Sequence, residues 1–362
     1  MPDTILYDSA LRLFGDLVTP QVLAAAEQGV WPGALWSAVE AAGYPDVLAA
    51  GAAGMVEATT ILRAAGYHAA PIPLAETMLA RWLCAACGVD APVGALTIGP
   101  VEAEDRLDIA EAAVSGHAGY IPWGREVAAV VLIAGNTLLV AEQQAVKFTP
   151  GKNLAAEPRD HLDAVEPGGR YAPLAQAADA PLMQRFGALF RAAQMAGAME
   201  AALGLSTRYA NDRVQFGRPI AKFQAIQQQL ALLAEQAAAA SVAVESAAIA
   251  VAADRPSAAL AIAAAKIRAG EAAGKVAEIA HQVHGAIGFT QEHSLHRLTR
   301  RLWSWRDEFG SESHWSRELG REVMAAGPNA LWPTITAGCD DHRGMNAAQS
   351  SAKGEGLPQE AP

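Results

Sequence analysis

The second half of the chain contains three consecutive helical segments of about 30 residues each, separated only by short breaks. They cover residues 180–213, 221–253 and 256–284, and glycine or proline marks each break. At a rise of 1.5 Å per residue, each helix would be about 45 Å long. A further helix is predicted over roughly 291–326. Long helices joined by short connections pack antiparallel, so the sequence predicts a four-helix bundle over 179–328.

The first half of the chain has a different pattern. Residues 1–90 are rich in alanine and leucine, with apolar residues at helical spacing, and predict an N-terminal helical domain. Residues 91–178 contain the apolar runs AVVLIAG and TLLVAEQ on either side of a turn at Asn136, which is typical of a β-hairpin. The expected fold is therefore mainly α with a middle β domain. Residues 329–362 have few apolar side chains and predict a disordered tail.

The overall composition excludes several classes of function. The net charge is −11, hydrophobic residues make up 52% and charged residues 18%, so the chain is not intrinsically disordered. An acidic chain is unsuited to binding nucleic acid, whose phosphates need a basic surface. We found no uninterrupted apolar run long enough for a membrane span, no basic leader and only three cysteines. We expect a soluble cytoplasmic protein that binds neither membranes nor nucleic acid.

Two glycine-marked breaks between the long helices carry the strongest chemical signal. The first contains Arg213, Phe216 and Gly217, with Gln224 shortly after it. The second contains a glutamine and two glycines at regular spacing, Gln282, Gly285 and Gly288. Backbone N–H groups at such breaks are free to bind an anion, and an arginine supplies charge for a pyrophosphate. Taken alone, each break is equally consistent with an ordinary turn bearing a surface arginine.

Taken together, these segments resemble the flavin-binding signatures of the acyl-CoA dehydrogenase family, and the resemblance covers roughly residues 5–328. It implies that Arg213, Phe216 and Gln224 contact FAD, with the arginine reaching the pyrophosphate across a dimer interface. The stretch Gln282–Gly288 would lie against the ADP moiety. The resemblance also implies a flavoprotein oxidoreductase of lipid metabolism that acts on acyl-CoA and passes electrons to an electron-transfer flavoprotein.

Further residues are implied to lie near the flavin, with one departure from the family pattern. Thr97 occupies the place of a threonine that contacts the flavin ring, and Gly310 and Ser311 would line the cofactor near the substrate. Pro122 stands where the family commonly carries a hydroxyl residue. Because proline has no hydroxyl and no N–H, that side-chain hydrogen bond to the flavin is lost.

The catalytic base is missing from both positions where the family carries it. Removing the α-proton of a thioester needs a positioned carboxylate and hydrogen bonds to the thioester oxygen. One family position, twenty residues after Phe289, is Phe309 here. The other, 26 residues before Arg213, is Gly187. Neither residue can accept a proton.

Three explanations follow. The chain resembles the short, glutamate-lacking subunits of heteromeric steroid side-chain acyl-CoA dehydrogenases, which implies an α2β2 assembly whose partner supplies the glutamate. Alternatively, a self-sufficient homotetramer uses Glu308, although adjacent helical residues point roughly 100° apart. A third possibility is a non-catalytic structural subunit. A steroid-type acyl chain is suggested only by the resemblance.

Two other clusters suggest less. The histidines at 281, 284, 293 and 296 are close in sequence, but no carboxylate or cysteine set completes a zinc site, so we predict no metal. The charged residues of the last helical segment, among them Arg301 and Glu308, predict a solvated helix face or a subunit interface.

Overall fold

The computed structural model describes residues 4–49, 51–100, 106–110, 113–166, 168–175, 180–329 and 332–333. The chain divides into two compact units, Met1–Trp315 and Ser316–Pro362. In the second unit, Arg321 pairs with Glu318 within one helix. The predicted disordered tail, 329–362, lies almost wholly outside the described residues.

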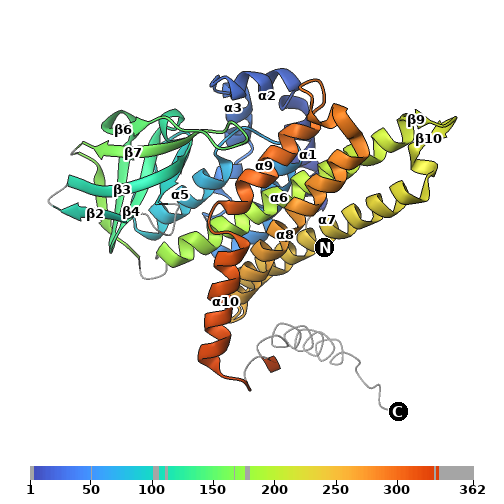
Figure 1. Cartoon of the computed structure of the whole chain (residues 1–362). Coiled ribbons are helices and arrows are strands. Elements are labelled where there is room, and N and C mark those ends of the chain that lie inside the picture. Colours follow the sequence, from blue (N-terminus) through green and yellow to red (C-terminus); the bar gives the residue numbers. More distant parts are fainter. Residues whose placement is uncertain are drawn as a thin grey trace, which may run out of the picture. The chain divides into compact units, whose positions relative to one another are not determined.

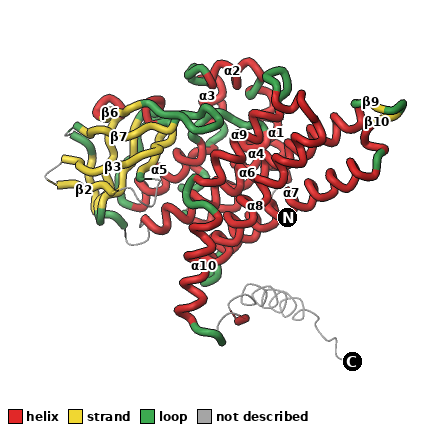
Figure 2. The backbone as a smooth tube through the Cα atoms, in the orientation of Figure 1, coloured by secondary structure: helices red, strands yellow, loops and turns green. Residues whose placement is uncertain are grey.

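Helices form the N-terminal part of the first unit, as Figures 1 and 2 show. They are α1 (Thr4–Leu17), α2 (Pro20–Glu27), α3 (Gly33–Ala41), α4 (Met55–Tyr67) and α5 (Leu74–Ala86), with short 3-10 turns η1 (Tyr44–Asp46) and η2 (Ala52–Gly54). Their apolar residues recur on one face and are buried, for example Phe14, Val39 and Ile61 at 0% exposure. Thr19 caps α2 by accepting a hydrogen bond from Val22 N–H.

The middle of the chain forms two four-stranded sheets in the orders β1-β4-β5-β8 and β2-β3-β7-β6. The strands are β1 (Leu96–Gly99), β2 (Arg106–Ala110), β3 (Ala113–Pro122), β4 (Ala129–Ala134), β5 (Thr137–Glu142), β6 (Val146–Thr149), β7 (Arg159–Val165) and β8 (Arg170–Pro173), with 3-10 turns η3 (Gly124–Glu126) and η4 (Gln143–Ala145). The predicted hairpin is confirmed as β4 and β5. Gly135, with φ +56°, supplies the left-handed backbone of its two-residue turn.

Residues 180–326 are mainly helical and are organised around α6, which contacts α4, α7, α8 and α9. The elements are α6 (Ala180–Asp212), β9 (Val214–Gln215), β10 (Arg218–Pro219), η5 (Ile220–Lys222), α7 (Gln224–Ala252), α8 (Ala258–His284), η6 (Gly285–Phe289), α9 (Leu295–Asp307) and α10 (Glu312–Ala326). The predicted fold class, mainly α with a middle β region, is confirmed.

The single helix predicted over 291–326 is wrong, because the structure has two helices there. They are α9 and α10, and a short turn separates them. Phe309 and Gly310 in that turn have φ values of +55° and +92°, which a right-handed helix does not allow. One of the two family base positions, Phe309, therefore lies in a turn between helices, and the other, Gly187, lies within α6.

Helix α7 meets the length and composition criteria for a membrane span, alone among the helices that the structure describes. Only 33% of its most apolar stretch is buried. A bundle helix of a soluble protein meets the same criteria, so this is weak evidence for a membrane. Its outward face nevertheless carries exposed apolar residues, Leu232 at 41% and Val242 at 65%.

Candidate functional site

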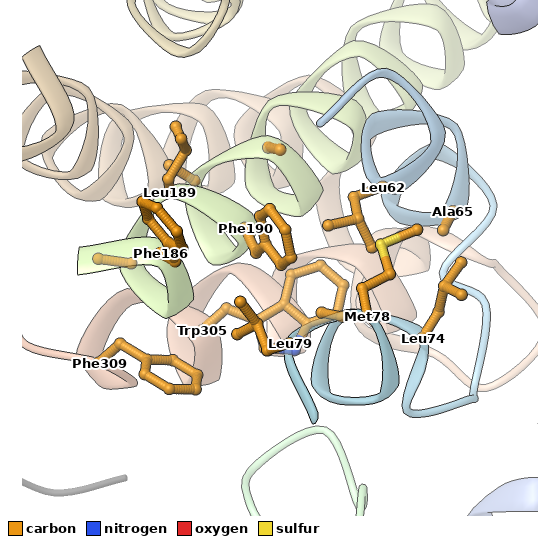
Figure 3. Packing of buried hydrophobic residues seen from close by; sticks show 14 of the residues in the cluster. Leu62, Ala65, Leu74, Met78, Leu79, Phe186, Leu189, Phe190, Trp305 and Phe309 are labelled. Carbon is orange, nitrogen blue, oxygen red and sulfur yellow. The ribbon is translucent and has the colours of Figure 1, made fainter. Parts of the chain in front are cut away.

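The two positions where a base was expected lie in direct contact. Gly187 is in the second turn of α6, and the ring of Phe309 packs on it so closely that a Cβ atom at 187 would overlap the ring. Phe309 is only 3% exposed. Figure 3 shows its ring in the apolar core that also contains Phe186 and Trp305. The space that a carboxylate would need at either position is filled with hydrocarbon.

Glu308, the alternative base, belongs to a buried ionic cluster rather than to a solvated helix face. Its carboxylate accepts from Arg159 Nε at 2.8 Å and from Arg191 Nε at 2.7 Å. Arg159 Nη2 at 3.0 Å and Asn153 at 3.2 Å donate two more hydrogen bonds to it. The side chain is 6% exposed. The prediction of a solvated face is therefore wrong for Glu308, because tertiary contacts from other elements cover it.

This buried ionic cluster joins all three parts of the fold. It contains three carboxylates and three guanidinium groups, each at most 6% exposed: Glu76, Glu157, Glu308, Arg159, Arg191 and Arg301. Arg191 also pairs with Glu76 of α5. Arg301 of α9 pairs with Glu157 at 3.0 Å, so the solvated-face prediction is wrong for Arg301 as well. Equal numbers of opposite charges allow every member to remain ionised in a dry interior.

The electrostatics of the cluster oppose a role for Glu308 as a general base. Burial alone would raise the pKa of its carboxyl, but Arg159 and Arg191 outweigh burial and lower that pKa to about 2. A general base works best with a pKa near the working pH. A carboxylate held by two guanidinium groups is a poor proton acceptor, so this geometry favours a structural role.

The predicted cofactor motifs gather at the opposite end of α6. Arg213 directly follows α6, and Phe216 is at the turn of the β9–β10 hairpin, 92% exposed (Figure 1). Tyr209 of α6 stacks on His284 of α8 with ring centroids 4.7 Å apart, which brings Gln282–Gly288 to the same end. From Gly187 to Asp212, α6 spans about 38 Å at 1.5 Å per residue. A single chain thus separates its arginine hairpin from its own base positions.

The end that carries these motifs has features that fit FAD. Arg213, Gln224, Gln282 and Gly285 are exposed, and Gly288 is buried. Two buried nitrogens beside this turn, His281 Nδ1 and His284 Nε2, have no hydrogen-bond partner among the residues that the structure describes. Burial is the main cause that lowers the pKa of both histidines, so both imidazoles are neutral near pH 7. The guanidinium of Arg213 suits a phosphate group. The unpaired histidine nitrogens suit an adenine ring, whose polar atoms also need hydrogen-bond partners.

The remaining predicted residues are in the β region and the α9–α10 turn. Thr97 is fully buried in β1, and its hydroxyl donates to the carbonyl of Pro122. To donate a hydrogen bond to a flavin, the hydroxyl of Thr97 would first have to break its hydrogen bond to Pro122. Gly310 and Ser311 follow Phe309 directly, so they lie beside the filled base position. Among the residues that the structure describes, no group of three or more histidine, cysteine or acidic residues is placed to hold a metal.

The buried ionic cluster and Lys266 were not predicted from the sequence. Five of their members lie on five different elements, Glu157 and Glu308 lie in connecting loops, and no spacing marks them as neighbours. A charged residue inside an otherwise apolar helical face, such as Arg191 or Lys266, is the one local signal available.

Comparison with known proteins agrees with this architecture. Residues 184–312 match the acyl-CoA dehydrogenase C-terminal domain. The acyl-CoA dehydrogenase IpdE2 of Mycobacterium tuberculosis is 32% identical over 304 residues, covering 80% of this chain and 81% of the relative. The chain belongs to the acyl-CoA dehydrogenase family. A shorter match, 36% identical, covers 51% of this chain and 46% of the 3-sulfinopropanoyl-CoA desulfinase of Paraburkholderia xenovorans.

Solved structures of acyl-CoA dehydrogenases share the fold. The Tcur3481–Tcur3483 steroid acyl-CoA dehydrogenase G363A variant has a TM-score of 0.79 at 24% identity, covering 90% of this chain and 98% of that one. A chain of the ChsE4–ChsE5 complex from Mycobacterium tuberculosis has a TM-score of 0.77 at 22% identity, covering 90% and 97%. At these identities the likeness shows the fold alone, and this chain is an oxidoreductase by its family membership.

Proposed function

We propose that this chain is one subunit of a heteromeric, FAD-dependent acyl-CoA dehydrogenase that forms the 2,3-double bond of an acyl-CoA thioester. The observation that carries the proposal concerns the two family base positions. They hold Phe309 and Gly187, which have no carboxylate and which fill the space by packing against each other. Bound FAD would supply the hydride acceptor, held by Arg213 and the Gln282–Gly288 stretch. The α-proton would go to a glutamate of the partner subunit.

Three further observations support a partner. Glu308 is fixed by Arg159 and Arg191 and so does not replace the missing base. The arginine hairpin is at the far end of α6 from the chain's own base positions, so it suits a flavin held against another subunit. The exposed apolar side chains of Phe216 and Phe289, at 92% and 68%, surround the same end and suit a covered interface.

The proposed substrate class and electron acceptor are based on similarity to related proteins. Two structures with this fold are named as a steroid acyl-CoA dehydrogenase and as a two-protein complex, which supports a bulky acyl chain and an α2β2 assembly. Electron-transfer flavoprotein is the proposed acceptor. A second candidate function, a non-catalytic structural subunit, is favoured by the filled base position alone.

An anaerobic titration of the co-expressed complex with acyl-CoA thioesters, one with a steroid side chain included, tests the proposal. We expect the visible absorbance of bound flavin to bleach in the complex, and to persist when this chain is purified alone. Bleaching by this chain alone would contradict the proposal, because it would then carry its own base. If the partner subunit is purified without this chain and its flavin bleaches equally well, the structural role is favoured.

Replacing Arg213 with alanine tests the cofactor site. We expect the FAD content of the purified complex to fall by about tenfold or more, since a charged hydrogen bond to a phosphate contributes about 1.5–3 kcal/mol. The matched control is Arg12→Ala, which removes the same side chain from an exposed position on α1. Flavin absorbance per protein measures the outcome, and unchanged FAD content in Arg213→Ala would argue against this site.

A further inference from the structure

Lys266 is a fully buried lysine in the third turn of α8. Its ammonium group donates hydrogen bonds to three backbone carbonyls, those of Trp305 at 3.3 Å, Arg306 at 2.5 Å and Gly310 at 2.9 Å. Burying a lysine is costly unless its donors are satisfied. Here the number of N–H donors equals the number of carbonyl acceptors.

The three carbonyls lie at the end of α9 and in the turn that separates α9 from α10. Trp305 and Arg306 are in the last turn of α9, where carbonyls lack helical partners. Gly310 is in the turn itself, where it and Phe309 are two successive residues with positive φ. The indole N–H of Trp315 donates to the carbonyl of Phe309 at 3.0 Å, so the turn is also held from the α10 side.

We propose that Lys266 is a positioning residue that fixes the α9–α10 turn and so presents Gly310 and Ser311 to the cofactor. This inference rests on the proposed function in one respect, the placement of those two residues beside FAD. The ammonium acts as a cap that closes the end of α9 and ties it to Gly310 in the turn. Lys266 does not touch the reacting atoms.

The protonation of Lys266 then controls the turn. A charged ammonium has three N–H donors for the three carbonyls, and a neutral amine has two. Burial lowers the pKa of Lys266 to about 8, while Glu312, Glu308 and Asp307 oppose the shift and Arg191 adds to it. This set of three Lys266 hydrogen bonds, the clamp, is therefore complete below about pH 8. It loses one donor as the pH rises through that value.

The first test measures the turn itself, without reference to flavin. In Lys266→Met we expect amide hydrogen exchange over residues 305–311 to rise by about tenfold or more, because hydrogen bonds to a charged donor are lost. The control is Lys275→Met, which removes an exposed lysine from the same helix and should leave exchange unchanged. Wild-type exchange at these amides in Lys266→Met would overturn the proposal.

The second test measures FAD binding by the assembled complex. We expect Lys266→Met to lower FAD affinity and shift the flavin absorption bands, while Lys275→Met does neither. FAD affinity of the wild type should fall as the pH rises through about 8, and Lys266→Arg, which stays charged, should retain affinity at pH 9. If Lys266→Met does not fold, Lys266→Arg still tests the proposal. An identical pH profile in Lys266→Arg would overturn the proposal. A wild-type complex without FAD would instead refute the proposed function, and hydrogen exchange would still test the clamp.

Discussion

Replacing Glu308 with glutamine is expected to lower the free energy of unfolding by about 3–5 kcal/mol, the usual cost of removing one partner from a buried ion pair. Glutamine keeps the shape of the side chain but leaves the charges of Arg159 and Arg191 without their shared carboxylate. Chemical denaturation near pH 7 measures the loss. The control is Glu278→Gln, whose carboxylate is 70% exposed and pairs with Lys275, and which should cost less than about 1 kcal/mol.

The pH dependence of this difference is a further check on the same variant. The pKa of Glu308 is about 2 in the folded chain, below its value of about 4.3 in an unfolded one. The carboxylate therefore stabilises the fold above about pH 4.3, and this contribution is lost as the pH falls toward 2. The gap between wild type and Glu308→Gln should narrow over that interval. A variant with wild-type stability that fails to bleach its flavin would mark Glu308 as a base instead.

Replacing Gly197 with alanine is expected to destabilise the chain by at least about 3 kcal/mol, the upper range for overpacking a tight interior. Gly197 is in α6 where that helix crosses α4, and a Cβ atom there would overlap the carbonyl oxygen of Arg63. Backbone cannot move aside as a flexible side chain does. Denaturation of the soluble protein, or its absence from the soluble fraction, measures the effect.

Gly204, two turns further along α6, provides the control. A Cβ atom there would meet only the ends of Arg208 and Tyr67 side chains, no closer than 3.6 Å. Gly204→Ala should be neutral or stabilising by up to about 1 kcal/mol, since alanine favours helix. Equal losses in the two variants would mean that helix geometry, and not the α4–α6 crossing, sets the cost.

Local sequence patterns predicted most of the fold. The segments 180–213, 221–253 and 256–284 correspond to α6, α7 and α8 within a few residues, because breaks at glycine and proline act over short range. The hairpin around Gly135 was predicted for the same reason. The break between α9 and α10 was missed, because a phenylalanine with positive φ has no signature in sequence.

The interior of the site depends on contacts between distant residues, so the sequence could not predict it. Glu308 reads as one more charge on an amphipathic helix until Arg159 and Arg191, 149 and 117 residues earlier in the chain, are placed beside it. Family motifs identified where a base should be and that it was missing. They did not reveal that the two vacant positions touch.

That contact makes positions 187 and 309 a mutually exclusive pair. Because the ring of Phe309 occupies the space of any side chain at Gly187, a carboxylate is admitted at 187 only after residue 309 becomes small. Recovery of an internal base by that route requires two substitutions in a fixed order, the first of which opens a cavity and lowers stability. The first of these substitutions lowers stability before any catalytic gain, so a base at position 187 cannot be regained by a single mutation.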